Sequence, residues 1–327
     1  MKTAMFALLT ALLIGILSGP FIIILLRRLK FGQTIRAEGP KRHLQKAGTP
    51  TMGGIIFLAA STIAILIWGD GSRELMLVLF ATLFYGLIGF VDDGIIIMLK
   101  RSLGLTAKQK LAFQFLLAFF FLYIACHVLG RGTHLIVPVL GMEWELGIFY
   151  YLFISLFMVF MVNAVNLTDG LDGLAGGISF LVLLTYLIIC LLSINHPPVE
   201  GLNYNDLAVG AGALAGGILA FLFFNRYPAK VFMGDTGSLA LGGAVMAFAI
   251  LTKTEILFIL IGGVYFLEAL SVVIQVSSFR LTGKRVFKMS PLHHHFEMCG
   301  WPETRVVALF WVFAAILAGL GLLLTLL

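Results

Sequence analysis

Charged residues are scarce in this sequence. Asp, Glu, Lys and Arg make up 12% of the 327 residues, whereas hydrophobic residues make up 60%. A soluble globular domain carries about 25% charged residues, so the composition excludes an ordinary soluble domain and indicates a polytopic membrane protein. No charged or Pro/Ser-rich linker is long enough to separate two domains, and we expect one integral-membrane domain over residues 1–327.

Cysteine is scarce as well. The three cysteines, Cys126, Cys190 and Cys299, are scattered and odd in number. They have no metal-ligand spacing, and their number argues against a disulfide framework. A Walker A loop is also missing, because no Gly-Lys-Ser/Thr follows the glycine-rich stretch 234–238.

Long apolar runs are abundant. A helix needs about 20 apolar residues to cross a bilayer, and the first run is interpreted as a spanning helix, not a cleaved signal peptide, because it continues past Pro20 to a basic cluster at 27–30. The eighth run is the weakest, being short and glycine-rich. The expected fold is all-α, with ten spans at Thr3–Leu26, Thr51–Trp68, Leu75–Val91, Leu111–Leu129, Leu146–Val165, Ile178–Ile194, Leu207–Phe224, Leu239–Leu251, Ile256–Phe279 and Val306–Leu327.

The basic residues lie almost entirely on one side of these spans. With both termini outside, the inner segments 27–50, 95–110, 166–177, 225–238 and 280–305 hold all Lys and Arg except Lys2, Arg73, Arg131 and Lys253. This bias predicts the orientation by the positive-inside rule. The net charge of +6 is then a property of the cytosolic face.

Carboxylates gather on the same face. Asp169 and Asp172 are three residues apart in Asn163–Gly177, so a helical turn would put them on one side, and the glycines there allow a ligand to approach the backbone. The alternative is a plain polar hairpin between two spans. Asp92 and Asp93 are expected at the end of the third span, where a metal or a lysine would offset their unfavourable interaction with the helix dipole.

Two further inner segments carry candidate residues. Gly234–Ser238 resembles a helix N-terminus, which favours phosphate, and Asp235 is either its N-cap or a metal ligand. The consecutive histidines His293, His294 and His295 point in different directions on a helix, so contact with phosphate, contact with a metal ligand or proton transfer is favoured over a three-histidine zinc site.

Basic and buried polar residues complete the pattern. Lys46, in the basic segment before the second span, suits a phosphate neighbourhood or is only a positive-inside flank, and Lys108 and Lys110 open the fourth span. Glu268 and Gln275 are seven residues apart on the ninth span, where structural burial is the favoured interpretation.

Together these features predict a site for a polyanionic substrate and a divalent metal at the cytosolic surface. A transporter is the alternative class, but its charges would gather near the midplane.

Four motifs resemble one enzyme family. Val91-Asp-Asp93, Asn163–Gly173, Phe232–Ser238 and Pro291-Leu-His-His-His-Phe-Glu297 are similar to those of the polyprenyl-phosphate N-acetylhexosamine-1-phosphate transferases. The last motif and Thr49–Gly54 resemble the bacterial phospho-N-acetylmuramoyl-pentapeptide transferase branch, over essentially the whole chain. A sister enzyme that uses UDP-GlcNAc or another UDP-HexNAc is the alternative, and the histidine motif argues against it.

The resemblance implies a function and its residues. It implies a homodimer in the bacterial plasma membrane that transfers phospho-MurNAc-pentapeptide from UDP-MurNAc-pentapeptide to undecaprenyl phosphate with Mg2+, giving lipid I and UMP; no nucleic-acid partner is expected. The implied catalytic residues are Asp92, Asp93, Asp235 (also the magnesium ligand), His293 and Lys110. The implied substrate-binding residues are Lys46, Thr51, Asn166, Asp169, Gly170, Asp172, Asn225, Phe232, Ser238, His294 and His295.

The family usually has a basic residue three or four positions after the Asp pair. This chain has none there, so Lys100, Lys108 or Lys110 is expected to take its role.

Overall fold

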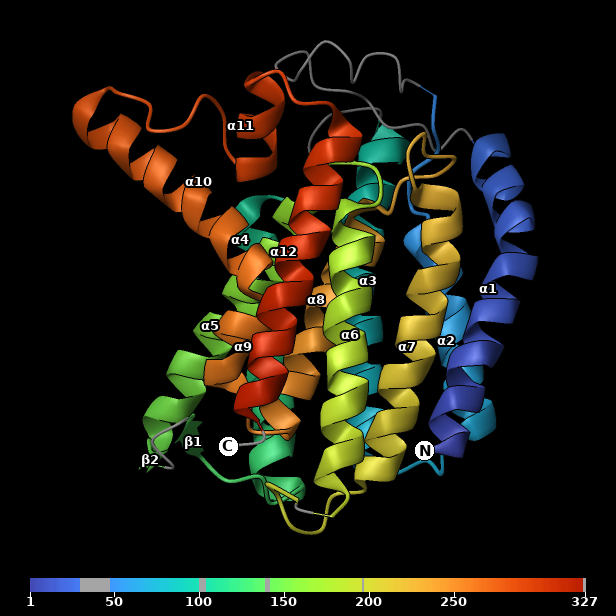
Figure 1. Ribbon diagram of the computed structural model, residues 1–327, viewed down its shortest axis with the longest axis vertical. Helices are drawn as coiled ribbons and strands as arrows, with labels where there is room; N and C mark the ends of the chain where they lie inside the picture. The colour runs from blue at the N-terminus through green and yellow to red at the C-terminus, as the bar shows by residue number, and fades with distance from the viewer. Residues whose placement is uncertain (30–47, 100–103, 139–141, 196, 326–327) are drawn as a thin grey trace.

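The computed structural model is a helical bundle, and it describes residues 1–29, 48–99, 104–138, 142–195 and 197–325. The helices run mainly along the long axis of the molecule (Figure 1). The elements in chain order are α1 (Lys2–Arg28), α2 (Gly54–Trp68), α3 (Arg73–Leu99), α4 (Ala107–Tyr123), the π-helical turn η2 (Ile124–Val128), β1 (His134–Val137), β2 (Met142–Glu145), α5 (Ile148–Thr168), α6 (Leu174–Ser193), α7 (Tyr204–Asn225), α8 (Gly234–Leu251), α9 (Glu255–Ile261), α10 (Gly263–Thr282), α11 (Leu292–Met298) and α12 (Glu303–Leu324).

The helices confirm a polytopic membrane protein. Within the described ranges nine helices are long and apolar enough to cross a membrane, and α2, with 15 residues, is shorter. Each of the ten predicted runs falls on a helix. The exposed faces of α1, α5 and α12 carry large apolar side chains such as Phe21, Phe149 and Val312, as expected for surfaces that meet lipid chains instead of water.

The ninth predicted run is not one helix, contrary to the prediction. It breaks at Gly262 into α9 and α10, and α10 leans away from the bundle (Figure 1). A Cβ on Gly263 would come within 2.8 Å of Leu317 Cδ1. Adjacent glycines weaken a helix and are a frequent place for kinks, and this pair also allows α12 to pack closely.

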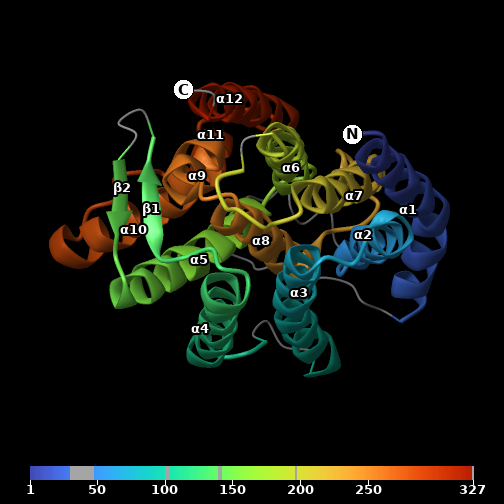
Figure 2. The same cartoon turned by 90° about the horizontal axis from the view of Figure 1, so that it is seen from below.

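Helix α8 lies at the centre of the bundle. It packs against α2, α3, α5 and α6, and in the view along the helices its neighbours surround it (Figure 2). Every residue from Thr236 to Leu251 is buried. A helix with no lipid-facing side can be rich in small residues and modest in hydropathy, which explains why this span gave the weakest apolar signal in the sequence.

The two ends of the bundle differ in their connections. Loops 104–106, 169–173, 226–233 and 283–302 lie at one end, together with the start of α8 and the short helix α11. The first residue of α1, the end of α12 and the antiparallel β1–β2 hairpin lie at the opposite end (Figure 1). Within the described ranges, the polar loop segments singled out from the sequence therefore share one end of the molecule, as predicted.

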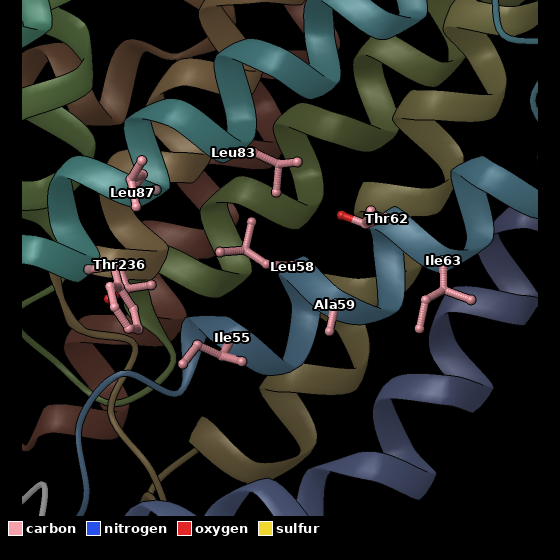
Figure 3. Close-up of a pocket in the computed structure, with 10 residues that line it drawn as sticks. Ile55, Leu58, Ala59, Thr62, Ile63, Leu83, Leu87 and Thr236 are labelled. Carbon is pink, nitrogen blue, oxygen red and sulfur yellow. The ribbon is translucent and has the colours of Figure 1, made fainter.

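An apolar pocket opens between α2 and α3. It has a volume of about 340 Å³ and is lined by Ile55, Leu58, Ala59, Thr62, Ile63, Leu83, Gly86, Leu87, Phe90 and Thr236 (Figure 3). No charged side chain lines it, so it offers nothing to pair with a phosphate. The candidate site is instead the polar cluster beside it, at the start of α8.

Candidate functional site

The site is built around the N-terminus of α8, which a carboxylate of α3 caps. Asp93 Oδ1 accepts from the backbone N–H of Asp235 at 3.2 Å, and Asp93 Oδ2 accepts from the backbone N–H and the hydroxyl of Thr236 at 2.9 and 2.7 Å. These donors are otherwise unpaired at a helix start, and the negative charge suits the positive end of the helix dipole.

Two sequence predictions are corrected here. Asp235 is not the N-cap of α8, since it is the second residue of the helix. Asp92 and Asp93 do not end α3, because the apolar residues after them continue that helix to Leu99. The expected cost of carboxylates at a helix C-terminus therefore does not arise, and Asp93 interacts favourably with another helix.

A lysine lies between two of the carboxylates. Lys110 Nζ forms an ion pair with Asp235 Oδ2 and lies 4.0 Å from Asp92 Oδ2. Asp92 Oδ1 accepts from the backbone N–H of Leu105 at 2.8 Å, and Thr106 caps the helix that carries Lys110. Of the three lysines considered for the missing basic residue, Lys110 contacts the carboxylates, Lys108 is exposed, and Lys100 is outside the described residues.

Asn166 holds the other oxygen of Asp235. Its Nδ2 donates to Asp235 Oδ1 and to Ser238 Oγ, both at 2.8 Å, and the Ser238 hydroxyl donates to the carbonyl of Gly234 at 3.1 Å. Residues from α5 and the first turn of α8 are thus joined in one hydrogen-bond network.

The turn between α5 and α6 contains Asp169 and Asp172, which do not share a helical face as predicted. Helix α5 ends at Thr168 and α6 begins at Leu174. Among the described residues nothing donates a hydrogen bond to the Asp169 side chain. Burial, together with the negative charges of Asp235, Asp93 and Asp172, raises the pKa of Asp169 to about 8.

Asp172 and Asn225 brace two loops. Asp172 Oδ2 accepts from the backbone N–H of Ala229 at 2.9 Å. Asn225 Oδ1 accepts from the backbone N–H of Gly173 at 2.9 Å, and its Nδ2 donates to the carbonyl of Val231 at 2.9 Å. Both side chains are buried. They therefore fix the position of loop 226–233 against the α5–α6 turn, next to the cluster.

His293 is buried against the same turn. Its ring Nδ1 and backbone N–H each lie 3.2 Å from the Glu268 carboxylate. Its Nε2 has no hydrogen-bond partner among the described residues and faces Gly170, where a Cβ would come within 2.2 Å of it. Only a glycine at position 170 allows the ring to lie there.

The other two histidines have separate partners. His294 Nδ1 lies 2.8 Å from Glu297 Oε2, and His295 Nδ1 accepts from the backbone N–H of Lys288 at 3.1 Å. Within the described ranges no three His, Cys, Asp or Glu side chains are arranged to hold a metal. The rings of His293 and His294 lie side by side, with centroids 4.2 Å apart, so these two histidines do not point apart as expected, although their Nδ1 atoms face different carboxylates.

Two further predicted residues, Thr51 and Phe232, lie near the start of α8. Thr51 is buried, and its Oγ1 lies 2.9 Å from where a Cβ on Gly234 would be; Gly234 itself has φ +73°. The backbone of Phe232 pairs with Pro50 O and Gly53 N, each at 2.8 Å. Lys46 lies outside the described residues.

Three residues with structural roles here, Glu268, Gln275 and Thr236, were not among the predicted site residues. Glu268 was expected to be buried but not to contact His293, and Gln275 on the same helix accepts from the backbone N–H groups of Val286 and Phe287. Thr236, the main partner of Asp93, lies in the motif Gly-Asp-Thr-Gly-Ser, which predicted a helix start. Nothing in the sequence indicated that a distant aspartate would cap it.

The oxygen donors of the cluster suit Mg2+. This ion prefers carboxylate oxygens and commonly takes one or two of them in addition to substrate phosphates. Asp235 Oδ2 and Asp92 Oδ2 face the same cationic group, Lys110. The chemistry of the donor set therefore fits a divalent cation at Asp235.

Comparison with known proteins shows the family of the chain. Residues 75–253 match the family model described as glycosyl transferase family 4, and residues 46–58 match phospho-N-acetylmuramoyl-pentapeptide-transferase signature 1. Proteins named phospho-N-acetylmuramoyl-pentapeptide-transferase are 54% identical in Desulfitobacterium hafniense (96% of this chain, 95% of that protein), 51% in Moorella thermoacetica (98% of each) and 47% in Bacillus subtilis (98% and 97%). The chain therefore belongs to the phospho-N-acetylmuramoyl-pentapeptide-transferase family.

Proposed function

We propose that this transferase moves phospho-MurNAc-pentapeptide from UDP-MurNAc-pentapeptide to undecaprenyl phosphate, forming lipid I and UMP. The observation that carries the proposal is the meeting of Asp92, Lys110, Asn166 and Asp235, which come from four helices, at one end of a membrane bundle. A reaction between two phosphates needs such a group of cation-binding and cationic side chains. Relatives that align over nearly the whole chain carry the name of this activity.

We place the site at the cytosolic face of the bacterial plasma membrane. The inner segments predicted by the positive-inside rule carry most of the basic residues, and the site lies at their end of the bundle. The nucleotide donor is water-soluble, so this end is where it reaches the enzyme. A transporter is disfavoured, because the cluster lies at helix ends and the buried Glu268 is bonded to His293.

The turn 169–173 supplies the donor pocket in this proposal. A pKa of about 8 keeps most Asp169 carboxyl groups protonated near neutral pH, so this group can donate a hydrogen bond to a uracil or sugar oxygen. Gly170 leaves room for the His293 ring beside this turn. Asp172 and Asn225 hold the loop that carries Phe232. Thr51 and Lys46 are assigned to the same pocket from the family resemblance, and Lys46 lies outside the described residues.

The reaction proceeds by direct displacement in this proposal. The lipid phosphate has a second pKa near 6, so it is largely a dianion at neutral pH and needs little help from a base. One of its oxygens forms a bond to the β-phosphorus of the donor. The bond from this phosphorus to the bridging oxygen breaks, and UMP leaves with the electron pair.

The side chains neutralise charge during this step. Asp235 and Asp92 would hold Mg2+, whose charge offsets that of the diphosphate. Lys110 lies beside both carboxylates and can pair with a phosphate oxygen. Asp93 is occupied by three donors of α8, which favours a positioning role for it. Asp92 Oδ1 accepts from the Leu105 amide and keeps a second lone pair, so it would accept the proton from the minor protonated fraction of the lipid phosphate.

One reconstituted assay tests the function. The purified protein with Mg2+, UDP-MurNAc-pentapeptide and a polyprenyl phosphate should release UMP, and omission of the lipid should stop release. UDP-GlcNAc in place of the donor should give no product. Turnover of UDP-GlcNAc at an equal rate would instead identify the sister activity. Asp235→Asn should abolish Mg2+-dependent turnover.

Two finer parts of the proposal have separate tests. A phosphorylated Asp92 or Asp93, trapped with donor but without lipid, would contradict direct displacement. We also propose a homodimer, which the family resemblance supports. Light scattering of the protein in detergent should give the mass of two chains after correction for bound detergent, and the mass of one chain would contradict it.

A further inference from the structure

We propose that Lys110 is a resident counter-ion that occupies the place of the metal at Asp235 and leaves Asp235 Oδ2 when the divalent cation binds. The inference rests on the proposed Mg2+ dependence and adds a function for one lysine. It predicts that the ammonium group and the cation compete for the same oxygens.

The competition follows from counting the oxygens of the three aspartates. Asp93 has both oxygens bonded to the start of α8. Asp235 Oδ1 accepts from Asn166, and Asp92 Oδ1 accepts from Leu105. Asp235 Oδ2 and Asp92 Oδ2 accept none of these hydrogen bonds and are the oxygens nearest to the lysine ammonium.

These two oxygens have the same cationic neighbour. Lys110 Nζ is in ion-pair contact with Asp235 Oδ2 and 4.0 Å from Asp92 Oδ2. A divalent cation that used these two oxygens would have to lie where the ammonium now lies. The two cations cannot share that space, because each would repel the other at contact distance.

The lysine can move without moving its helix. The capping box of Thr106 and Gln109 fixes the first turn of α4, whereas the lysine stem has four rotatable carbons and a compact charge. The Lys110 side chain is 17% exposed, so its head has a way out toward solvent. After displacement it remains next to the metal, where a bound diphosphate would be its nearest anion.

The arrangement has a function in both states. Without a metal, Lys110 offsets the mutual repulsion of Asp92 and Asp235 and keeps the site formed. With a metal, it becomes available to the phosphates of the donor. Lys110 thus pairs with substrate only after the cation is in place.

Metal binding without turnover tests the inference. The affinity for Mn2+, used as a probe for Mg2+, is measured by electron paramagnetic resonance on full-length protein in detergent without substrate. Lys110→Gln removes the competitor, and we expect Mn2+ to bind about three- to tenfold more tightly than in the wild type. The matched control is Lys108→Gln, an exposed lysine two residues away, which should bind Mn2+ as the wild type does. Unchanged or weaker binding in a folded Lys110→Gln protein would overturn the inference.

A second measurement uses the wild-type protein only, so it does not depend on the folding of a variant. The lysines are acetylated with a water-soluble reagent, with and without Mg2+, and the sites are quantified by mass spectrometry. Mg2+ should increase the acetylation of Lys110 and leave that of Lys108 unchanged. Equal acetylation of Lys110 in both conditions would show that the ammonium does not move.

One variant separates this inference from the proposed function. Asp235→Asn should abolish the binding of Mn2+. If Mn2+ still binds to this variant with full affinity, the metal assignment is wrong. If Asp235→Asn does not bind Mn2+ but Lys110→Gln binds it as the wild type does, Asp235 remains the metal ligand and only the competition with Lys110 is rejected.

Discussion

Asp93 and Thr236, which are 143 positions apart in the chain, connect helices α3 and α8. The Asp93 carboxylate accepts from both the backbone N–H and the hydroxyl of Thr236, at 2.9 and 2.7 Å. Because Asp235 precedes Thr236, this contact also fixes where the proposed metal ligand lies. These contacts favour a positioning role for Asp93, which the family resemblance implied as a catalytic residue.

Replacement of Asp93 is expected to destabilise the protein. Asp93→Ala removes the cap of α8 and leaves buried donors unpaired, which should lower the free energy of unfolding by about 1–3 kcal/mol. Thr236→Val keeps the shape but loses the hydroxyl, and about 1 kcal/mol is expected. Thermal unfolding in detergent measures both. Thr236→Ser retains the hydroxyl and serves as the control, and an unchanged melting temperature for Asp93→Ala would contradict the capping role.

Gly89 is expected to be irreplaceable, unlike a nearby glycine of the same helix. A Cβ at Gly89 would lie 2.0 Å from the carbonyl oxygen of Asp235, whereas one at Gly94 meets nothing within 4 Å. Gly89→Ala should push the start of α8 away, cost about 1–3 kcal/mol and reduce UMP release strongly. Gly94→Ala should be neutral or slightly stabilising, because alanine favours a helix. Equal stability and activity of the two variants would show that α3 and α8 can separate at this point without loss.

Asn166 is expected to matter more than Ser238, although both belong to one network. Asn166→Ala removes the hydrogen bond to the Asp235 carboxylate. Hydrogen bonds to charged groups are worth about 1.5–3 kcal/mol, so kcat/KM should fall roughly 10- to 100-fold. Ser238→Ala removes a neutral acceptor from Asn166 and a hydrogen bond to the Gly234 carbonyl. Neither bond involves the Asp235 carboxylate, so this variant should cost less than about tenfold. Initial rates of UMP release measure both, and a larger loss for Ser238→Ala would contradict this order.

Asp169 is expected to make stability dependent on pH. Its pKa of about 8 in the folded protein lies above the value of about 3.9 in an unfolded chain. The folded state therefore holds a proton that the unfolded state releases, and stability is fully present below about pH 4 and lost as pH rises through about 8.

The test compares the wild type with Asp169→Asn. The asparagine side chain is neutral at every pH. The melting temperature of the variant should therefore change less than that of the wild type between about pH 5 and about pH 9. Parallel curves for the two proteins would mean that the Asp169 carboxyl does not hold a proton in the folded state. The comparison needs no substrate, so it is independent of the proposed activity.

The sequence by itself determined the membrane class, the apolar runs and the end of the bundle where the polar residues gather. Low charge and repeated apolar runs leave few alternatives, because a bilayer-crossing chain must satisfy its backbone hydrogen bonds within each span. The motifs around Asp93, Asn166, Asp235 and His293 also identified the family, which the relatives confirmed.

Only the tertiary structure decided what each polar side chain contacts. Asp235 resembled an N-cap, but the cap is Asp93 from another helix, and the pair Asp169 and Asp172 occupies a turn, not a helical face. Such contacts depend on how closely α3 and α8 pack, which Gly89 permits at a distance of 146 residues from Asp235. Local spacing predicts which residues share a helix face, whereas a cap or an ion pair between helices depends on packing that no single segment encodes.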